Sequence, residues 1–327
     1  MALLCLLVSC EWKPWQDFFG SSSVPKASIR RYDRIVDEYV ALNSYASWEQ
    51  MTGQYPQETK LLIEDVLGLG HVDEARIERK LRLFCLDSIV QVLFQEVHRQ
   101  YPDMKAEEEA LYTAFMKVKK ADPAFRIPRI YTQISALNQS IVVGDSILGI
   151  SLDKYLGEDF PLYKQYYSDY QIHTMRRDRI VPEALFFYLM AEYPVPGWPD
   201  ATVRDYVFHV GKLHWIVSDL LDFSMEQESP FDGQTMAWCK KHETDIRDWV
   251  RENNLLAEKD SAVVRMMLVQ SPATPALGKD APGQLGVWLG CRIMESYMEK
   301  HPGLTVAELL NMQDYEKMLK ESGYDLL

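Results

Sequence analysis

The chain contains seven histidines, and their spacing decides whether they can hold a catalytic metal. A zinc peptidase site needs two histidines one helical turn apart with a glutamate between them, the His-Glu-x-x-His pattern. The single His-Glu pair is His242-Glu243, and Ile246 stands where the second ligand would be. His209 and His214 are five residues apart, which puts them about 140° apart around a helix. We therefore predict isolated surface or rim histidines, with no metal and no other cofactor.

Cys10 indicates a different chemistry. Residues 1–10 form a short apolar run that ends in Leu-Val-Ser-Cys, the order of a bacterial lipobox. In such a segment small Ser9 lets the signal peptidase approach, and Cys10 receives the acyl chains. No Lys or Arg precedes the run, so we expect the true start codon to lie upstream. The alternative is a buried N-terminal strand with an ordinary cysteine. We predict a lipoprotein signal segment at 1–10, lipidation at Cys10, and a Gly/Ser-rich tether at 11–27.

Other catalytic constellations are missing from the sequence. It contains no Gly-x-Ser-x-Gly elbow, and Gly144-Asp145-Ser146 lacks the lysine and the glycine pattern of a phosphate loop. The five cysteines show no CxxC pairing, so neither a disulfide framework nor a thiolate zinc site is predicted. Cys291 lies in an apolar helical stretch, where a buried and inert thiol is expected. We assign no catalytic residue.

Two groups of residues leave a ligand site open. Glu183 and Glu192 share the helical stretch 181–193, and a hydrolase with a non-standard site would place them in a cleft between this helix and the sheet. Four tyrosines recur at the spacing of one helical face: Tyr163, Tyr166, Tyr167 and Tyr170. We favour packing of these rings with hydroxyls at the rim. The alternative is an exposed, coplanar stacking surface in a substrate-binding lipoprotein.

These residues must be positioned by a mainly helical chain with one region of sheet. Residues 126–134 read as a half-buried strand, and 140–143 and 147–151 are short β-branched runs separated by hairpin chemistry at Gly144-Asp145-Ser146. We expect one small antiparallel sheet. Helical patterns flank it on both sides, at 61–67, 77–101, 105–120, 181–193, 202–221 and 234–253.

The C-terminal region carries two local signals. Gly286 and Gly290 are four residues apart in an apolar helical stretch, which predicts that another backbone approaches this helix closely. Thr305 is followed three residues later by Glu308, the pattern of a capping box at a helix start.

Composition excludes several classes of protein. The 327-residue chain is 47% hydrophobic, enough for a sizeable core, and 25% charged, so it is not disordered by composition. Its net charge is −13 without a basic stripe, and we therefore expect no nucleic-acid partner. The sequence contains no apolar run of about 18 residues, so we predict no membrane-spanning helix.

Several segments resemble one family. They are the lipobox, Ile-Leu-Gly-Ile-Ser-Leu-Asp-Lys-Tyr-Leu-Gly (147–157), Ile-Val-Pro-Glu (180–183) and Pro-Gly-Gln-Leu-Gly-Val-Trp-Leu-Gly-Cys-Arg-Ile-Met-Glu-Ser-Tyr-Met (282–298). Together they resemble the gliding motility lipoprotein GldB family of the Bacteroidetes over nearly the whole chain. That family looks like a relative of zincin-like, zinc-dependent peptidases, in which a sheet precedes the helix with His-Glu-x-x-His. The stretch 181–193 contains no histidine, so we expect no metal-dependent proteolysis.

The resemblance implies an α+β, mainly helical, zincin-like fold, with one domain over 28–327. It implies an envelope lipoprotein on a bacterial membrane, the outer membrane above all, with the remainder periplasmic or surface-exposed. Because the metal ligands are missing, we expect a non-catalytic interaction scaffold whose partners are other envelope proteins and, through its anchor, the membrane. Asp153, Tyr155 and Glu183 lie in the segments that carry the resemblance and are our candidate functional surface.

Overall fold

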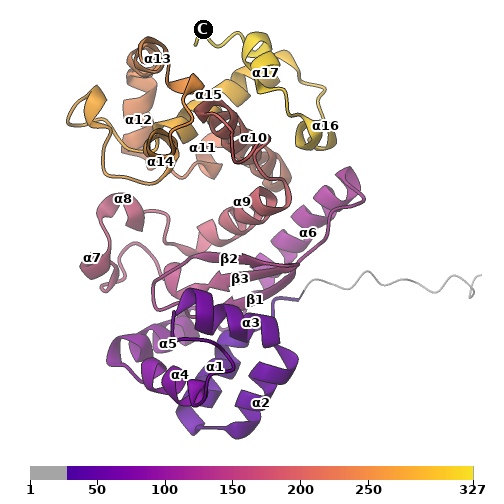
Figure 1. Ribbon diagram of the computed structural model, residues 1–327, viewed down its shortest axis with the longest axis vertical. Helices are drawn as coiled ribbons and strands as arrows, with labels where there is room; N and C mark the ends of the chain where they lie inside the picture. Colours follow the sequence, from indigo (N-terminus) through magenta and orange to yellow (C-terminus); the bar gives the residue numbers. More distant parts are fainter. Residues whose placement is uncertain (1–27, 327) are drawn as a thin grey trace, which may run out of the picture.

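The computed structural model describes residues 28–326, and this part of the chain is mainly helical (Figure 1). The lower layer in Figure 1 holds a π-helical turn at Leu61–Val66 and five helices: α1 (Tyr32–Leu42), α2 (Tyr45–Gln54), α3 (Pro56–Lys60), α4 (Ile77–Cys85) and α5 (Ser88–Gln100). The stretch 77–101, predicted as one long helix, is two. The chain breaks between them because the Asp87 carboxylate caps α5, accepting a hydrogen bond from the backbone N–H of Ile89 at 2.8 Å.

The sheet within the described residues has three strands, β1 (Arg129–Gln133), β2 (Ile141–Gly144) and β3 (Ile147–Ser151), in the order β1-β3-β2. The predicted hairpin is confirmed, since β2 and β3 pair antiparallel. The prediction of a purely antiparallel sheet is wrong, because β1 pairs parallel to β3. The loop 134–140 carries the chain past the end of β3 to the far edge, so β3 lies between two strands that precede it.

Helices cover both faces of this sheet. α9 (Ile180–Glu192) packs on β2 and β3, α1 packs on β1, and α6 (Lys105–Ala121) runs beside α9 (Figure 1). The short helices α7 (Tyr163–Tyr166) and α8 (Asp169–Ile172) stand at one side. The upper layer consists of α10 (Val203–Leu221), α11 (Met225–Glu228), α12 (Gly233–Lys241), α13 (Glu243–Glu252), α14 (Ser261–Leu268), α15 (Leu285–Lys300), α16 (Val306–Asn311) and α17 (Tyr315–Ser322).

The pair α10 and α15 forms the centre of the upper layer, and their backbones touch. A Cβ atom on Gly211 would lie 2.2 Å from the carbonyl carbon and oxygen of Gly290. A Cβ atom on Gly290 would lie 2.2 Å from the carbonyl oxygen of Val207. The close approach predicted from Gly286 and Gly290 is therefore confirmed. The predicted capping box is present as well, with reciprocal hydrogen bonds between Thr305 and Glu308 at the start of α16.

α10 is buried on nearly all sides, which overturns the prediction for two histidines. His209 and His214 are only 1% and 5% exposed, so neither is a surface or rim residue. α10 also buries the cationic Lys212, which is only 2% exposed. Charged and titratable residues in a sequence usually indicate a solvated helix face, so the sequence gave no sign that this helix is buried. The Lys212 ammonium donates to the carbonyl oxygen of Met312 at 2.9 Å, and His209 Nδ1 hydrogen-bonds to the Tyr315 hydroxyl at 2.8 Å. These bonds attach the C-terminal helices to α10.

Acid is expected to destabilise the fold through His209. Burial, with the Lys212 charge nearby, lowers the pKa of His209 from 6.5 to about 4. The unfolded chain binds a proton between pH 6.5 and pH 4 that the folded chain does not, so the free energy of unfolding falls as pH falls through this window. Between pH 7 and pH 5 the loss is about 2 kcal/mol.

Urea unfolding at both pH values measures this loss. His209→Gln keeps a hydrogen-bonding group for Tyr315 and should remove most of the difference between pH 7 and pH 5. His71→Gln is the control, because the His71 side chain is 77% exposed. Equal pH dependence in wild type and His209→Gln would contradict the assignment.

Candidate functional site

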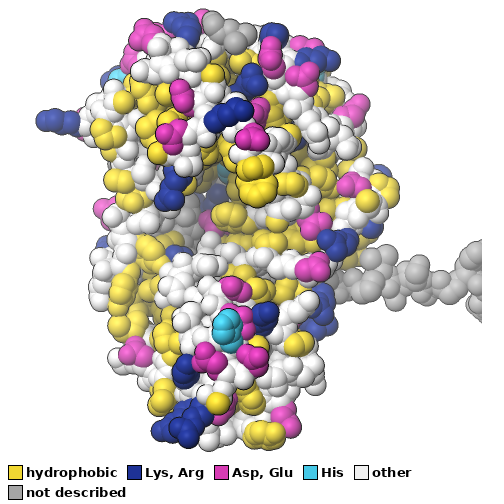
Figure 2. Space-filling model, in the orientation of Figure 1, with side chains coloured by type: hydrophobic (Ala, Val, Ile, Leu, Met, Phe, Trp, Pro, Cys, Tyr) yellow, Lys and Arg dark blue, Asp and Glu magenta, His cyan; other side chains and the backbone are white. Residues whose placement is uncertain are grey.

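A cavity of 460 Å³ opens beside α9, where the chain leaves β3. Its walls are mainly apolar and come from α9, α10, α14 and α15, with Phe186, Phe187, Met190, Val210, Leu268 and Val287 among them. Polar side chains from the ends of β2 and β3 and from α9 form the floor. Figure 2 shows the surface hollowed between the upper and lower layers of the molecule. Residues of α9 and residues at this end of the sheet, Ser140, Lys154 and Tyr155, thus border the cavity together.

Two of the three predicted site residues meet on this floor. The Tyr155 hydroxyl, which follows β3, donates to Glu183 Oε2 on α9 at 2.7 Å. Glu183 is half-buried, and its free side faces the cavity. Burial raises the pKa of the Glu183 carboxyl, and the Tyr155 hydrogen bond and the Arg179 charge only partly oppose this. Burial, with the Glu183 charge, raises the pKa of Tyr155 well above its ordinary value. The pair is therefore a desolvated donor and acceptor at the cavity floor.

Asp153, the third predicted residue, has a different role. It is fully buried and does not line the cavity. Its carboxylate accepts hydrogen bonds from the backbone N–H groups of Ser135 at 2.8 Å and Leu137 at 2.7 Å. Ala136 and Leu137 both have positive φ, 52° and 67°, a conformation that non-glycine residues adopt at a cost. Asp153 thus holds the turn that carries the chain from β1 to β2.

Lys154 connects this turn to the cavity, and sequence reasoning missed it although it stands between Asp153 and Tyr155. Its ammonium donates to the Tyr167 hydroxyl at 2.6 Å and to the Leu137 carbonyl oxygen at 3.4 Å. Tyr167 in turn donates to the same carbonyl. Burial lowers the pKa of Lys154, with the Asp153 and Glu183 charges opposing it. Lys154 therefore places a cationic group on the cavity floor near Glu183.

A buried hydrogen-bonded pair of side chains, His214 and Glu228, also lines the cavity. His214 Nδ1 lies 2.7 Å from Glu228 Oε2, and the Phe186 ring stacks on the imidazole with centroids 4.4 Å apart. Arg179 donates to the carbonyl oxygens of Gln227 and Glu228, at 3.1 and 2.7 Å, which fixes α11 against the start of α9. Sequence reasoning named His214 but placed it at the surface, and it had no signal for Glu228, 14 residues away.

Only part of the tyrosine segment packs into the core, and its rings do not form a stacking platform. It is broken into α7 and α8, so the four rings do not share one helical face. Tyr163 is fully buried and bonds to the backbone of Asp153 and Leu156. The Tyr163 and Tyr167 rings meet edge-on at 79°. The packing interpretation is therefore right for Tyr163, although its hydroxyl is buried and not at the rim, and it is wrong for Tyr166, which is 52% exposed. The alternative of a coplanar stacking surface is wrong.

The remaining candidate groups lie away from the cavity floor. Glu192 is at the far end of α9, with Oε1 4.0 Å from Arg126. Cys291 is 7% exposed and burial raises its pKa well above its ordinary value, as predicted for an inert thiol. Residues 28–326 contain no group of three or more His, Cys, Asp or Glu side chains arranged to hold a metal ion. Cys10 and the rest of the predicted signal and tether lie outside the described residues.

The family model described as gliding motility protein GldB matches residues 20–326. The chain belongs to the GldB family. Membership makes it a gliding motility lipoprotein of the GldB type, which indicates an envelope location. No curated protein and no solved structure matches the chain significantly. Among the helices that the structure describes, none has both the length and the apolar composition needed to span a bilayer. The cavity with its Tyr155–Glu183 floor is thus a feature of a GldB-family protein.

Proposed function

We propose that this GldB-family protein is a lipid-anchored interaction scaffold that receives a segment of another envelope protein in the cavity beside α9. The observation that carries the proposal is the lining of this cavity, with apolar walls around a small polar floor. Such a lining suits an apolar side chain that carries one polar group. The anchor would be Cys10, and the outer membrane is the membrane we propose for it.

The residues around Glu183 support a role without metal chemistry. Pro182 and Phe186 stand one residue before and three residues after Glu183, the two positions that imidazoles occupy in His-Glu-x-x-His. Neither side chain can ligate zinc. His214 alone does not replace the two missing imidazoles, because a zinc site needs three or more protein ligands and residues 28–326 contain no group of three or more His, Cys, Asp or Glu side chains arranged to hold a metal ion. If the fold is zincin-like, as we propose, its helix α9 has kept a glutamate and replaced both ligands.

Photo-crosslinking in intact cells tests the scaffold. Phe187 lines the cavity and is 43% exposed, so a photoreactive phenylalanine analogue at this position reaches any occupant. We expect one dominant adduct with an envelope protein. Phe223, 40% exposed at the end of α10 and outside the cavity, is the matched control. The proposal fails if position 187 yields no adduct, or if position 223 yields the same one. Labelled palmitate that enters wild type but not Cys10→Ser checks the anchor.

A hydrolase is the second candidate, and Glu183 favours it because burial raises the pKa of this carboxyl, which favours the protonated form that a general acid needs. Glu183→Gln separates the two functions, since glutamine keeps the size and the acceptor for Tyr155. A scaffold should retain both the adduct at position 187 and cell motility in this variant. Retention of the adduct with loss of motility would instead indicate a reaction that depends on Glu183.

A further inference from the structure

A second hollow of 430 Å³ adjoins the cavity. Thr174 and Arg179 line both spaces, so these two residues belong to the wall that the cavity and the second hollow share. The charged side chains around the second hollow include Glu158, Asp159, Lys164, Asp169, Arg176 and Asp232. Because both signs are present, this hollow suits polar side chains and does not select one charge.

Residues 164–174 stand between the two spaces, and we call them the flap. On one side of the flap Tyr167 and Gln171 line the cavity. On the other side Asp169 and His173 line the second hollow. The flap contains most of α7 and all of α8, which stand at one side of the molecule in Figure 1.

The flap is fixed at its ends and loosely packed between them. Buried Tyr163 precedes it and buried Met175 follows it. The Gly157 N–H donates to the Met175 carbonyl oxygen at 3.0 Å, which closes the base of the segment. Between these ends only Ile172 is buried. Segments with few buried side chains open at a lower free-energy cost than the core, so the flap can move while its base stays in place.

Two hydrogen bonds hold the flap against the upper layer in the part of the chain that the structure describes. Gln270 Nε2 donates to the Tyr170 carbonyl oxygen at 3.3 Å, and His173 Nε2 bonds to the Pro230 carbonyl oxygen. The bond of Tyr167 to the cavity floor is separate from these two. Loss of the first two bonds would therefore open a gap between the flap and the upper layer.

We propose that the flap lifts from the upper layer and joins the two spaces into one groove, through which the segment of the partner protein runs. The cavity alone holds a few side chains, but a segment inside a longer chain must leave the site as well as enter it. The joined groove gives such a segment apolar walls followed by polar ones. The expected segment therefore carries an apolar side chain next to polar residues. This inference rests on the proposed function, because it needs the same occupant.

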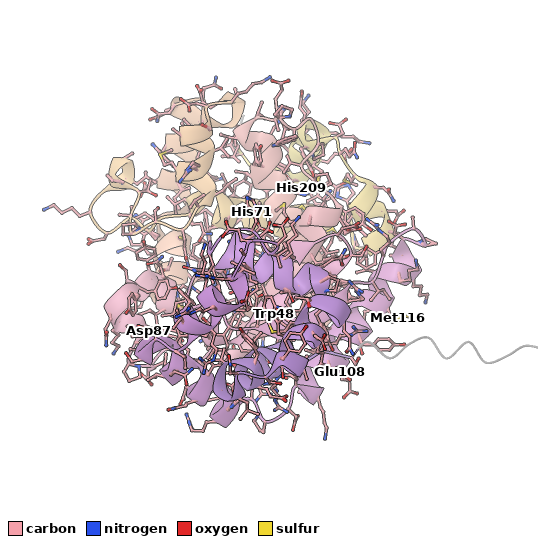
Figure 3. The ribbon with its side chains drawn as sticks, turned by 60° about the horizontal axis from the view of Figure 1, so that its bottom comes forward. Trp48, His71, Asp87, Glu108, Met116 and His209 are labelled. Carbon is pink, nitrogen blue, oxygen red and sulfur yellow. The ribbon has the colours of Figure 1, made fainter. Side chains whose placement is uncertain are left out.

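Hydrogen exchange of the full-length Cys10→Ser protein tests the movement. Amides of the flap should exchange faster than those of α10, and Gln270→Ala should raise their exchange rate about five-fold. Gln91→Ala is the matched control, because it removes a bond of the same kind, from a glutamine amide to the Cys85 carbonyl oxygen at 2.7 Å. Gln91 lies on α5, which begins after Asp87 in the lower layer that Figure 3 turns forward. The flap is overturned if its exchange matches that of α10 or ignores Gln270→Ala.

Photo-crosslinking at Phe231 tests the passage of the partner. Phe231 lines the second hollow from the upper layer. We expect a photoreactive phenylalanine analogue at this position to give the same adduct as at Phe187, with none at Phe223. An adduct at 187 without one at 231 overturns the joined groove and leaves the scaffold standing. The absence of an adduct at both positions overturns the scaffold and this inference together.

Discussion

Gly290→Ala is expected to lower the free energy of unfolding by about 3 kcal/mol. The added Cβ would lie 2.2 Å from the Val207 carbonyl oxygen, and the neighbouring backbone of Gly211 is also within 3.2 Å. Both contacts are with backbone, so no side chain can rotate away, and α10 and α15 must separate. Because these helices form the centre of the upper layer, their separation opens the core around them.

Gly53→Ala is the matched control, since it is the same substitution in another helix. Nothing lies within 4 Å of a Cβ at Gly53, and its φ is negative. There alanine should stabilise the protein by about 0.5 kcal/mol, through the higher helix propensity of alanine. Chemical denaturation of wild type and both variants measures the two effects. If Gly290→Ala changes the midpoint no more than Gly53→Ala does, the backbone contact is wrong.

Asp153→Ala is expected to cost about 4 kcal/mol, because it strands two buried backbone N–H groups and removes the support of a turn in the left-handed region. Asp153→Asn should cost roughly half as much. Its amide oxygen can still accept one of the two backbone bonds. The same loop carries the Leu137 carbonyl that Lys154 and Tyr167 contact, so the adduct at position 187 should also weaken in Asp153→Ala.

Asp145→Ala is the control for that series. Asp145 lies in the β2–β3 turn, and its side chain is 79% exposed, so the change should stay within about 0.5 kcal/mol. Thermal unfolding of the four proteins, wild type included, gives the order. If Asp153 supports the turn, Asp153→Ala should be the least stable protein, Asp153→Asn should be more stable, and wild type should be more stable than both. Equal stability of Asp153→Ala and Asp145→Ala would show that the turn does not depend on this carboxylate.

Local patterns in the sequence predicted local structure well. The hairpin at Gly144-Asp145-Ser146, the capping box at Thr305 and the close approach at Gly290 each depend on residues a few positions apart. The parallel pairing of β1 with β3 was missed because it depends on where the loop 134–140 crosses the sheet. That crossing is fixed by Asp153, which follows β3 and bonds back across 18 residues.

The candidate site was predicted in part for the same reason. Tyr155 and Glu183 were singled out from separate segments, but their hydrogen bond joins positions 28 residues apart. The burial of His209 and His214 could not be read from their spacing, because it follows from the position of α10 under other helices. Lys154 was overlooked between two chosen residues, since a lysine in sequence reads as a solvated charge until the structure buries it.

The first described residues join the fold at the edge of the sheet. The Arg30 backbone N–H donates to the Ile130 carbonyl oxygen at 2.9 Å, and the Arg30 carbonyl accepts from Thr132 N–H at 2.9 Å. The Ile29 N–H donates to Glu108 on α6 at 3.0 Å. Any mechanical load on the preceding chain therefore reaches the protein at these three bonds before it reaches the core. Under tension, the β1 edge and α6 are the parts of the molecule that would yield first.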